Sequence, residues 1–302
     1  MYEEFFGLRE KPFSLTPDTD FFYRFSGHQE ALNVLLVALH NGDGFVQVTG
    51  EVGTGKTLLC RQLLKILQDN CTTAYLPNPL LTPLELYQAI GNDLNLTFPA
   101  EASLQQLQQG ILTELIHLRE QQRPLVVLID EAQAMPFKSL EALRLLSNLE
   151  TEKEKLLQVC FFAQPEFELR LAEYKLRQLR QRVTFTYRLV ALQRLELTAY
   201  IQYRLQVAGF QGLIPFTPGA IKLLYRASGG VPRLINLLCH KTLLVAYGKG
   251  VRTINRSMVV SAIKDTNGLA QVTPAFLARY FYEFVLAMAA AVVVLVVLGV
   301  LR

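Results

Sequence analysis

The segment from Gly50 to Thr57, which reads GEVGTGKT, constrains the fold more than any other part of the sequence. It fits the pattern G-x-x-x-x-G-K-[ST], whose glycines let the main chain wrap around a phosphate with its N–H groups pointing inward. A short strand pattern, 45–49, precedes it and a helical pattern, 57–68, follows it. The loop therefore opens onto a helix N-terminus, whose dipole favours an anion. This context predicts an α/β domain that binds the phosphates of a nucleotide.

We expect this loop to bind ATP together with Mg²⁺. The Lys56 ammonium group would contact the β- and γ-phosphates, and the Thr57 hydroxyl would ligate the metal ion. The residues expected to contact the nucleotide form one continuous set: Gly50, Glu51, Val52, Gly53, Thr54, Gly55, Lys56, Thr57 and Leu58.

Two carboxylates follow an apolar run. Residues 125–129 read LVVLI, as expected for a strand buried on both faces, and lead directly into Asp130 and Glu131. Two acids at the end of a buried strand are costly unless a metal ion or another partner is present. We expect Asp130 to hold Mg²⁺ and Glu131 to accept a proton from an attacking water. A solvated strand end is the alternative.

The order of predicted elements indicates two domains. Up to about residue 195, strands alternate with helices, which favours a parallel sheet with helices on both faces. Four helical patterns follow, which predicts a small all-helical domain over 196–268. The predicted strands cover 45–49, 73–76, 125–129, 157–163 and 183–189; the predicted helices cover 28–40, 57–68, 84–94, 103–120, 139–149, 167–179, 198–208, 218–227, 232–247 and 256–265. Residues 1–27 are expected to form an ordered lead-in to the α/β domain that is not helical.

The last part of the chain predicts a transmembrane helix. Residues 284–301 carry no charged or strongly polar side chain, and as a helix they would span about 27 Å, close to the hydrocarbon core of a bilayer. Arg279 and the aromatic residues 280–282 precede them, as at a membrane interface. We therefore expect an anchor within 280–302, with a buried or dimerisation helix as the alternative. The N-terminus lacks a signal-peptide pattern, which predicts that the preceding domains lie in the cytoplasm.

Charge is distributed unevenly along the chain. Residues 1–169 carry 12 Lys and Arg against 22 Asp and Glu, whereas 197–264 carry 9 basic residues and no acidic one. Such an asymmetry favours head-to-tail association into rings or filaments, or contact of the basic part with phosphates or an anionic membrane. The 4 cysteines are widely spaced and offer neither a zinc site nor a disulfide framework, which fits a reducing compartment.

Several further motifs are shared with a known family: Phe6-Gly-Leu8, Pro12-Phe13, Thr16-Pro17-Asp18, His28-x-Glu30, Asp130-Glu-Ala-Gln133, Gln164-Pro-Glu166, the segment 176–182 and Gly229-Gly-Val-Pro-Arg233. With the phosphate loop, they make the sequence resemble the AAA+ superfamily. More closely it resembles the bacterial secretion and pilus ATPases of the general secretion pathway protein A type, over about residues 1–265. Within that group the MSHA pilus-biogenesis type fits better, because no peptidoglycan-binding domain follows here.

The resemblance implies further site residues. Gln164 matches the sensor-1 polar residue at a strand end, and Arg233 matches the sensor-2 arginine carried by the helical lid. A turn residue and a solvated arginine are the respective alternatives. An arginine finger that acts on a neighbouring subunit is expected just before the last strand. There Arg182 is the first choice and Arg177 the second, while Arg180 lies between them. His28 and residues 21–23 are candidates to contact the adenine.

The sequence and the resemblance together predict a membrane-anchored AAA+ ATPase. It would support assembly of a type IV (MSHA-like) pilus or a type II secretion apparatus at the bacterial inner membrane. The expected partners are copies of the chain itself, inner-membrane assembly proteins and membrane lipid. A DNA-binding regulator resembling transposition ATPases is one alternative, although the apolar tail and the lack of a helix-turn-helix extension argue against nucleic acid. A nucleotide-gated tether with slow hydrolysis is another.

Overall fold

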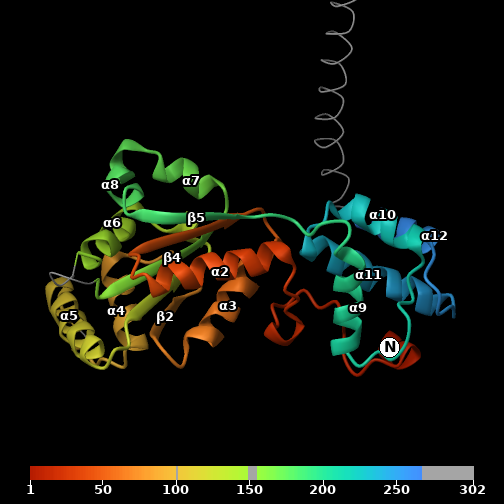
Figure 1. Cartoon of the computed structure of the whole chain (residues 1–302), viewed down its shortest axis with the longest axis horizontal. Coiled ribbons are helices and arrows are strands. Elements are labelled where there is room, and N and C mark those ends of the chain that lie inside the picture. The colour runs from red at the N-terminus through yellow and green to blue at the C-terminus, as the bar shows by residue number, and fades with distance from the viewer. Residues whose placement is uncertain (100, 149–154, 267–302) are drawn as a thin grey trace, which may run out of the picture.

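The computed structural model describes residues 1–99, 101–148 and 155–266. In these parts an α/β domain and a helical domain lie next to each other, joined by the chain after the last strand (Figure 1). The predicted membrane span 284–301 lies outside the described residues. Among the described residues, no helix has the length and apolar character needed to cross a membrane.

A five-stranded parallel sheet forms the centre of the α/β domain, as the alternating pattern predicts. Its strands follow the order β2-β3-β4-β1-β5, and every pairing is parallel. The strands β1, β4 and β3, neighbours in this order, therefore end at the same edge of the sheet. The strands are β1 (Phe45–Gly50), β2 (Thr72–Leu76), β3 (Leu125–Ile129), β4 (Leu157–Ala163) and β5 (Val183–Leu189).

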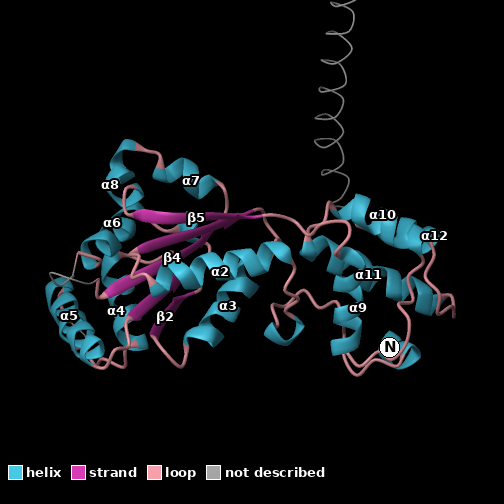
Figure 2. Cartoon of the chain, in the orientation of Figure 1, coloured by secondary structure: helices cyan, strands magenta, loops and turns pink. Residues whose placement is uncertain are grey.

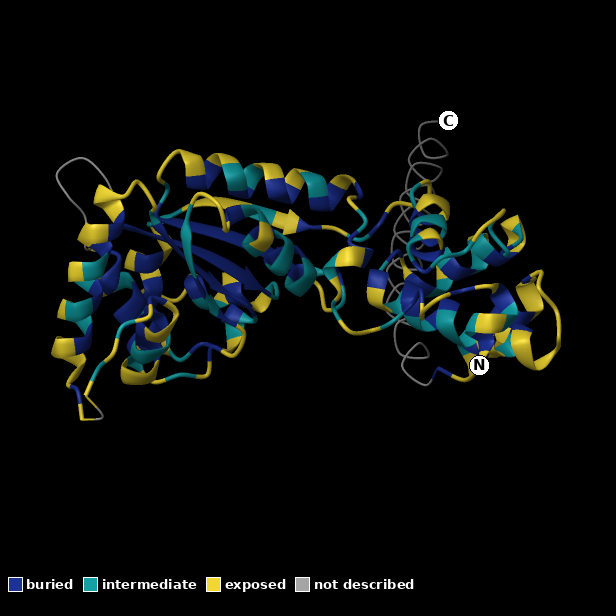
Figure 3. Cartoon of the chain, turned by 90° about the horizontal axis from the view of Figure 1, so that it is seen from below, coloured by how far each residue is buried: buried dark blue, intermediate teal, exposed yellow. Residues whose placement is uncertain are grey.

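Helices cover both faces of this sheet (Figure 2). Alternate strand residues enter two apolar clusters, because successive side chains of a strand point to opposite faces. One cluster contains Val48, Leu128 and Phe162 and packs against α2 (Ser26–His40) and α3 (Lys56–Leu67). The other contains Val127 and Phe161. It packs against α4 (Pro83–Asp93), α5 (Leu104–Glu120), α6 (Phe137–Leu146) and α7 (Glu166–Leu171). Figure 3 shows the resulting buried strands.

After β5, the described residues form a second domain built from four helices. Two of its helices begin at side-chain caps: the Thr217 hydroxyl accepts from the main chain of Ala220, and Asn255 accepts from Ser257. Such caps satisfy N–H groups that lack a partner in the first helical turn. The helices are α9 (Leu197–Val207), α10 (Pro218–Ser228), α11 (Pro232–Gly248) and α12 (Arg256–Lys264).

The N-terminal lead-in differs from the prediction in two ways. It contains a short helix, α1 (Tyr2–Phe6), and a 3-10 turn, η1 (Thr19–Phe21). Its aromatic side chains also pack in the core of the helical domain, where the Tyr2 hydroxyl lies 2.9 Å from His240 Nδ1. The segment was expected to belong to the α/β domain. Phe13, Phe21 and Phe25 are buried with α9 to α12, whereas Phe22 is buried in the α/β domain, so the lead-in contacts both domains.

The helix predicted over 167–179 is wrong as a single element. The chain forms α7, then a 3-10 turn η3 (Tyr174–Leu176) and a short helix α8 (Arg177–Arg180). The break falls at Glu173, whose backbone is extended (φ −61°, ψ 142°). The interruption lets Leu171, Leu176 and Leu179 all enter the core.

Candidate active site

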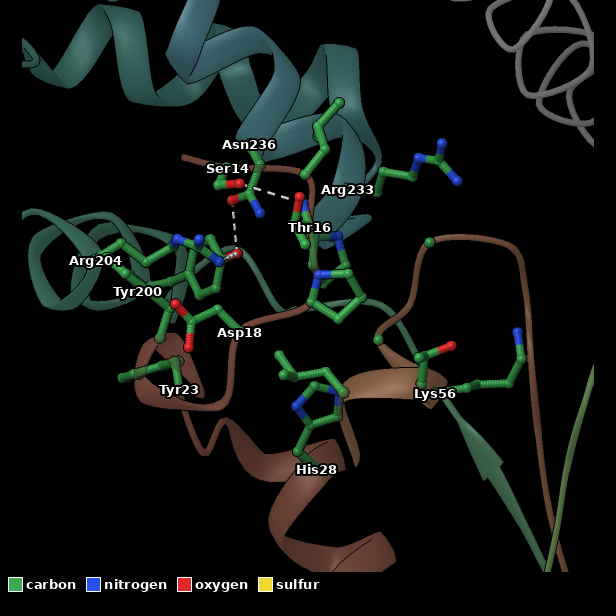
Figure 4. Close-up of a pocket in the computed structure, with 18 of the residues that line it drawn as sticks. Ser14, Thr16, Asp18, Tyr23, His28, Lys56, Tyr200, Arg204, Arg233 and Asn236 are labelled. Carbon is green, nitrogen blue, oxygen red and sulfur yellow. Dashed lines mark hydrogen bonds between the residues drawn. The ribbon is translucent and has the colours of Figure 1, made fainter. Parts of the chain in front are cut away.

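A cavity of about 310 Å³ lies where the two domains meet. It is lined by the phosphate loop, by the lead-in between Ser14 and Phe25, and by residues of α9 and α11. Figure 4 shows these segments around the cavity, with Lys56 on the loop and Arg233 reaching from α11. Residues of the α/β domain and residues of the helical domain, which follows β5, are therefore both needed to complete this site.

The phosphate loop follows β1 and ends where Lys56 begins α3. Gly53 and Gly55 have positive φ values of 83° and 99°, which favour glycine over residues with a Cβ atom. A Cβ atom on Gly55 would also lie 2.8 Å from His28 Nε2. The two glycines thus allow the tight main-chain path that a phosphate-binding loop requires.

The ammonium group of Lys56 is buried in the loop. The side chain of Lys56 is only 5% exposed, and its Nζ donates to the carbonyls of Gly50 at 2.8 Å and Glu51 at 3.1 Å. Burial lowers the pKa of Lys56. Lys56 forms no ion pair with the described residues, so an anionic phosphate would supply the missing opposite charge.

Asp130 and Thr57 place hard oxygen atoms next to the loop. Asp130 is 3% exposed, and burial raises the pKa of its carboxyl group while a hydrogen bond with the Thr57 side chain opposes the rise. Carboxylate and hydroxyl oxygens suit Mg²⁺, which also retains water and phosphate ligands. These two residues therefore fit the metal ion that the sequence predicts.

Glu131 is held by two glutamine amides. Its backbone is left-handed (φ 52°). Its Oε2 atom accepts from Gln164 Nε2 at 3.1 Å and from Gln133 Nε2. The main chain of Gln164 in turn donates to Gln133 Oε1 at 3.0 Å. The structure thus brings Glu131 and Gln164 together, as a shared site requires. It adds Gln133, which the sequence indicated only as the last residue of the motif Asp130-Glu-Ala-Gln133, without a role in the site.

Arg233 joins the lid to the phosphate loop. Its main-chain N–H donates to the carbonyl of Gly53 at 3.2 Å, and its exposed side chain lines the cavity. A Cβ atom on Gly53 would lie 2.8 Å from Arg233 Cβ. The helical domain therefore contacts the loop directly, and the guanidinium group is placed on the same cavity as Lys56.

The structure does not bring the candidate finger arginines into this cavity. Arg182 precedes β5, and its Nη1 donates to Ser147 Oγ at 2.8 Å and to the carbonyl of Arg144 at 3.3 Å. Arg177 and Arg180 are exposed, and the Arg177 guanidinium lies 4.7 Å from the centre of the Tyr174 ring. Arg182 is thus bound within its own domain, whereas the other two lie on the surface.

The buried His28 side chain contacts the main chain of the phosphate loop. It is 3% exposed, its Nε2 lies 3.1 Å from the carbonyl of Thr54, and its ring centroid lies 4.0 Å from that of Phe25. Burial lowers the pKa of His28 to about 4. Of the three aromatic residues expected near the adenine, Phe21 and Tyr23 line the cavity, whereas Phe22 stacks on His28.

The sequence is similar to known secretion and AAA proteins. A family model described as an AAA domain matches residues 39–171. General secretion pathway protein A of Aeromonas hydrophila is 44% identical over 269 residues. That alignment covers 89% of this chain but 49% of the relative, so the chain spans about half the length of that relative.

Solved structures share the fold. The ORC2 protein of Aeropyrum pernix matches with a TM-score of 0.61 and 16% identity, over 83% of this chain and 72% of that one. Cdc6p of Pyrobaculum aerophilum matches with 0.63 and 17%, over 80% and 67%. The RuvB branch migration motor of Thermotoga maritima matches with 0.54 and 18%, over 84% and 74%. The solved structures show a shared fold, while the AAA-domain match and the secretion relative relate the chain to AAA proteins of the general secretion pathway protein A type.

Proposed function

We propose that this chain binds ATP with Mg²⁺ in the cavity between its domains and hydrolyses it. The observation that supports this most is that the candidate site residues follow three neighbouring strands and lie at the same edge of the sheet. β1 leads into the phosphate loop, β3 into Asp130 and Glu131, and β4 into Gln164. Parallel strands that end at one edge bring these groups to one place, where the lid adds Arg233.

Each residue has a definite task in this proposal. Lys56 and the N–H groups of the loop bind the phosphates, while Arg233 adds a second cation from the lid. Thr57 and Asp130 would hold Mg²⁺, which neutralises charge on the phosphate oxygens when bound. Glu131 accepts a proton from water at a carboxylate oxygen. Gln133 and Gln164 both donate to Oε2 of Glu131 and orient that carboxylate.

Two substitutions test this activity. Lys56→Ala should abolish ATP binding in a fluorescence or calorimetric titration. Glu131→Gln should bind ATP but hydrolyse it at least about a hundredfold more slowly, because it removes a general base. Lys65→Ala is the matched control, since this lysine is exposed at the far end of α3. Unchanged ATP affinity in Lys56→Ala, or near-normal turnover in Glu131→Gln, would contradict the proposal.

The proposal extends to a place in the cell. The chain would be anchored in the bacterial inner membrane by residues 284–301, with the ATPase domain in the cytoplasm. There, with further copies of itself and inner-membrane proteins, it would support a type IV (MSHA-like) pilus or a type II secretion apparatus. The apolar segment and the similarity to general secretion pathway protein A support this role.

Fractionation tests the anchoring. The full chain should stay with membranes after a carbonate wash, and a chain that ends at residue 266 should be released. Retention of the shorter chain would show that residues 267–302 are not the anchor. A pull-down from the membrane fraction with the Glu131→Gln variant and ATP would then identify the partner proteins, because slow hydrolysis prolongs the ATP-bound state.

DNA binding is a second candidate, favoured by the exposed basic residues of the helical domain. The segment 197–264 has no acidic residue, and four of its exposed basic side chains lie on or near α10 and α12: Lys222, Arg226, Arg252 and Arg256. A DNA affinity of the chain ending at residue 266 that falls steeply with salt would support this candidate. A salt-dependent affinity for anionic vesicles without DNA binding would favour the membrane role.

A further inference from the structure

The end of the cavity away from Lys56 carries a buried polar network. Tyr200 and Arg204 on α9 and Asn236 on α11 line this end (Figure 4). The three residues are 4%, 4% and 7% exposed. Since the phosphate loop fixes the phosphates of a nucleotide at the other end, the base extends toward these side chains. This inference rests on the proposed binding of a nucleotide.

The network has one hydrogen-bonding direction. Arg204 Nη1 lies 3.2 Å from the Tyr200 hydroxyl, and that hydroxyl lies 2.7 Å from Asn236 Oδ1. Arginine can only donate, so the Tyr200 oxygen accepts from it. The single hydroxyl proton then donates to Asn236, which must present its carbonyl oxygen to Tyr200. The amide nitrogen of Asn236 is consequently directed away from Tyr200.

Arg204 is fixed in turn by the lead-in. Its Nε donates to the carbonyl of Pro12 at 2.6 Å, and its guanidinium lies 4.9 Å from the centre of the Phe21 ring. These contacts with the lead-in hold Arg204, the first donor of the hydrogen-bond network. Asn236 is oriented by this network and cannot exchange its carbonyl and amide ends without losing the Tyr200 hydrogen bond.

We propose that the Asn236 side-chain amide donates a hydrogen bond to N1 of adenine and selects ATP over GTP. N1 lies on the edge of the base farthest from the ribose, and Asn236 lies at the end of the cavity away from the loop. In adenine N1 is an acceptor, whereas in guanine it carries a hydrogen that would face the amide N–H group. Tyr200 and Arg204 are positioning residues, because they fix which end of the Asn236 amide faces the base.

Nucleotide analogues test this contact atom by atom. Dissociation constants of the full chain would be measured with Mg²⁺ and ATP, 1-deaza-ATP, 7-deaza-ATP or GTP. The wild-type chain should bind 1-deaza-ATP and GTP about fivefold to tenfold more weakly than ATP, the effect of one hydrogen bond. It should bind 7-deaza-ATP as it binds ATP. Asn236→Ala should bind ATP about as weakly as the wild type binds 1-deaza-ATP, with no further loss on the analogue.

Tyr200→Phe gives a second test, because it keeps the buried ring and removes only the hydroxyl. It should reduce the discrimination against 1-deaza-ATP while the chain keeps its folded circular dichroism spectrum. Asn33→Ala is the matched control, since Asn33 is exposed on α2, and its discrimination should equal that of the wild type.

Two outcomes overturn the inference. Either Asn236→Ala and Tyr200→Phe both keep the wild-type ratio of ATP to 1-deaza-ATP affinity, or the wild type binds all four nucleotides equally. A wild-type chain that binds none of them contradicts the proposed function itself, which separates the two failures.

Discussion

The side-chain amide of Gln164 donates to a carboxylate oxygen of Glu131 at 3.1 Å. This contact joins the end of β4 to the turn after β3, where Glu131 adopts a left-handed conformation. A non-glycine residue in that region is uncommon and costs free energy. The amides of Gln164 and Gln133 stabilise the carboxylate that this conformation presents at the edge of the sheet.

Gln164→Ala should lower kcat for ATP hydrolysis about tenfold to a hundredfold while KM changes little. The substitution removes a donor that orients the base, and correct orientation accounts for part of the effect of a general base. Steady-state turnover against ATP concentration measures both constants. Gln178→Ala, at an exposed position of α8, should behave as the wild type. A Gln164→Ala enzyme with normal kcat would remove Gln164 from the site.

Gly53→Ala should weaken both the fold and the binding of ATP. The added methyl group would lie 2.8 Å from Arg233 Cβ and 3.1 Å from Val231 Cγ1, at a residue with φ 83°. We expect the free energy of unfolding to fall by about 1–3 kcal/mol, together with a weaker contact between the loop and the lid. Thermal unfolding and an ATP titration measure the two effects.

Gly219→Ala on α10 provides the comparison for that variant. A Cβ atom there meets nothing within 4 Å, so stability and ATP affinity should be retained. Equal behaviour of the two alanine variants would show that the contact between Gly53 and Arg233 does not constrain the loop.

The central strands β3 and β4 could be predicted from the sequence because they are buried on both faces. Residues 125–129 and 157–163 are apolar at nearly every position, and their observed bounds equal the predicted ones. The helix predicted over 167–179 failed because its leucines have helical spacing although the chain turns at Glu173. The five-residue helix α1 was missed because so short a segment shows no reliable periodicity.

The loop and the acidic pair could be identified from the sequence because each is a contiguous motif. Gln133 was harder, since its task depends on the position of Gln164, 31 residues later in the chain. The network of Tyr200, Arg204 and Asn236 has no local pattern either. Its members come from two helices and depend on the main chain of Pro12. Only the packing of the lead-in against the lid brings these groups together.

The buried imidazole of His28 should make stability depend on pH. Its pKa is about 4 in the folded chain, against an ordinary value of 6.5. Between these values the unfolded chain binds more protons than the folded one, so stability falls as pH decreases from 6.5 toward 4. This linkage corresponds to a loss of about 2 kcal/mol between pH 7 and pH 5.

Urea unfolding at the two pH values measures that loss. His28→Leu should remove about this much of the difference, whatever its own stability at pH 7. His117→Leu, at an exposed position, should keep the wild-type difference. The same pH dependence in His28→Leu and in the wild type would show that His28 is not the group responsible.

The arginines before β5 should divide into structural and intersubunit groups. Arg182→Ala loses hydrogen bonds to Ser147 and Arg144, so its free energy of unfolding should fall by about 1–2 kcal/mol. Arg177 and Arg180 are exposed, and their alanine variants should stay within about 0.5 kcal/mol of the wild type. Because its guanidinium is already bound within the chain, Arg182 is less available than these two to act on a neighbouring subunit.

Mixed assemblies test this division. A chain with both Arg177→Ala and Arg180→Ala should hydrolyse ATP poorly, as should Glu131→Gln. When the two are mixed, some sites combine an intact Glu131 with intact arginines from the neighbour, so activity should return with a maximum at intermediate ratios. Full activity of the double variant alone would exclude both arginines as fingers. Recovery from mixtures of Arg182→Ala with Glu131→Gln, in the absence of a stability loss, would assign the finger to Arg182 instead.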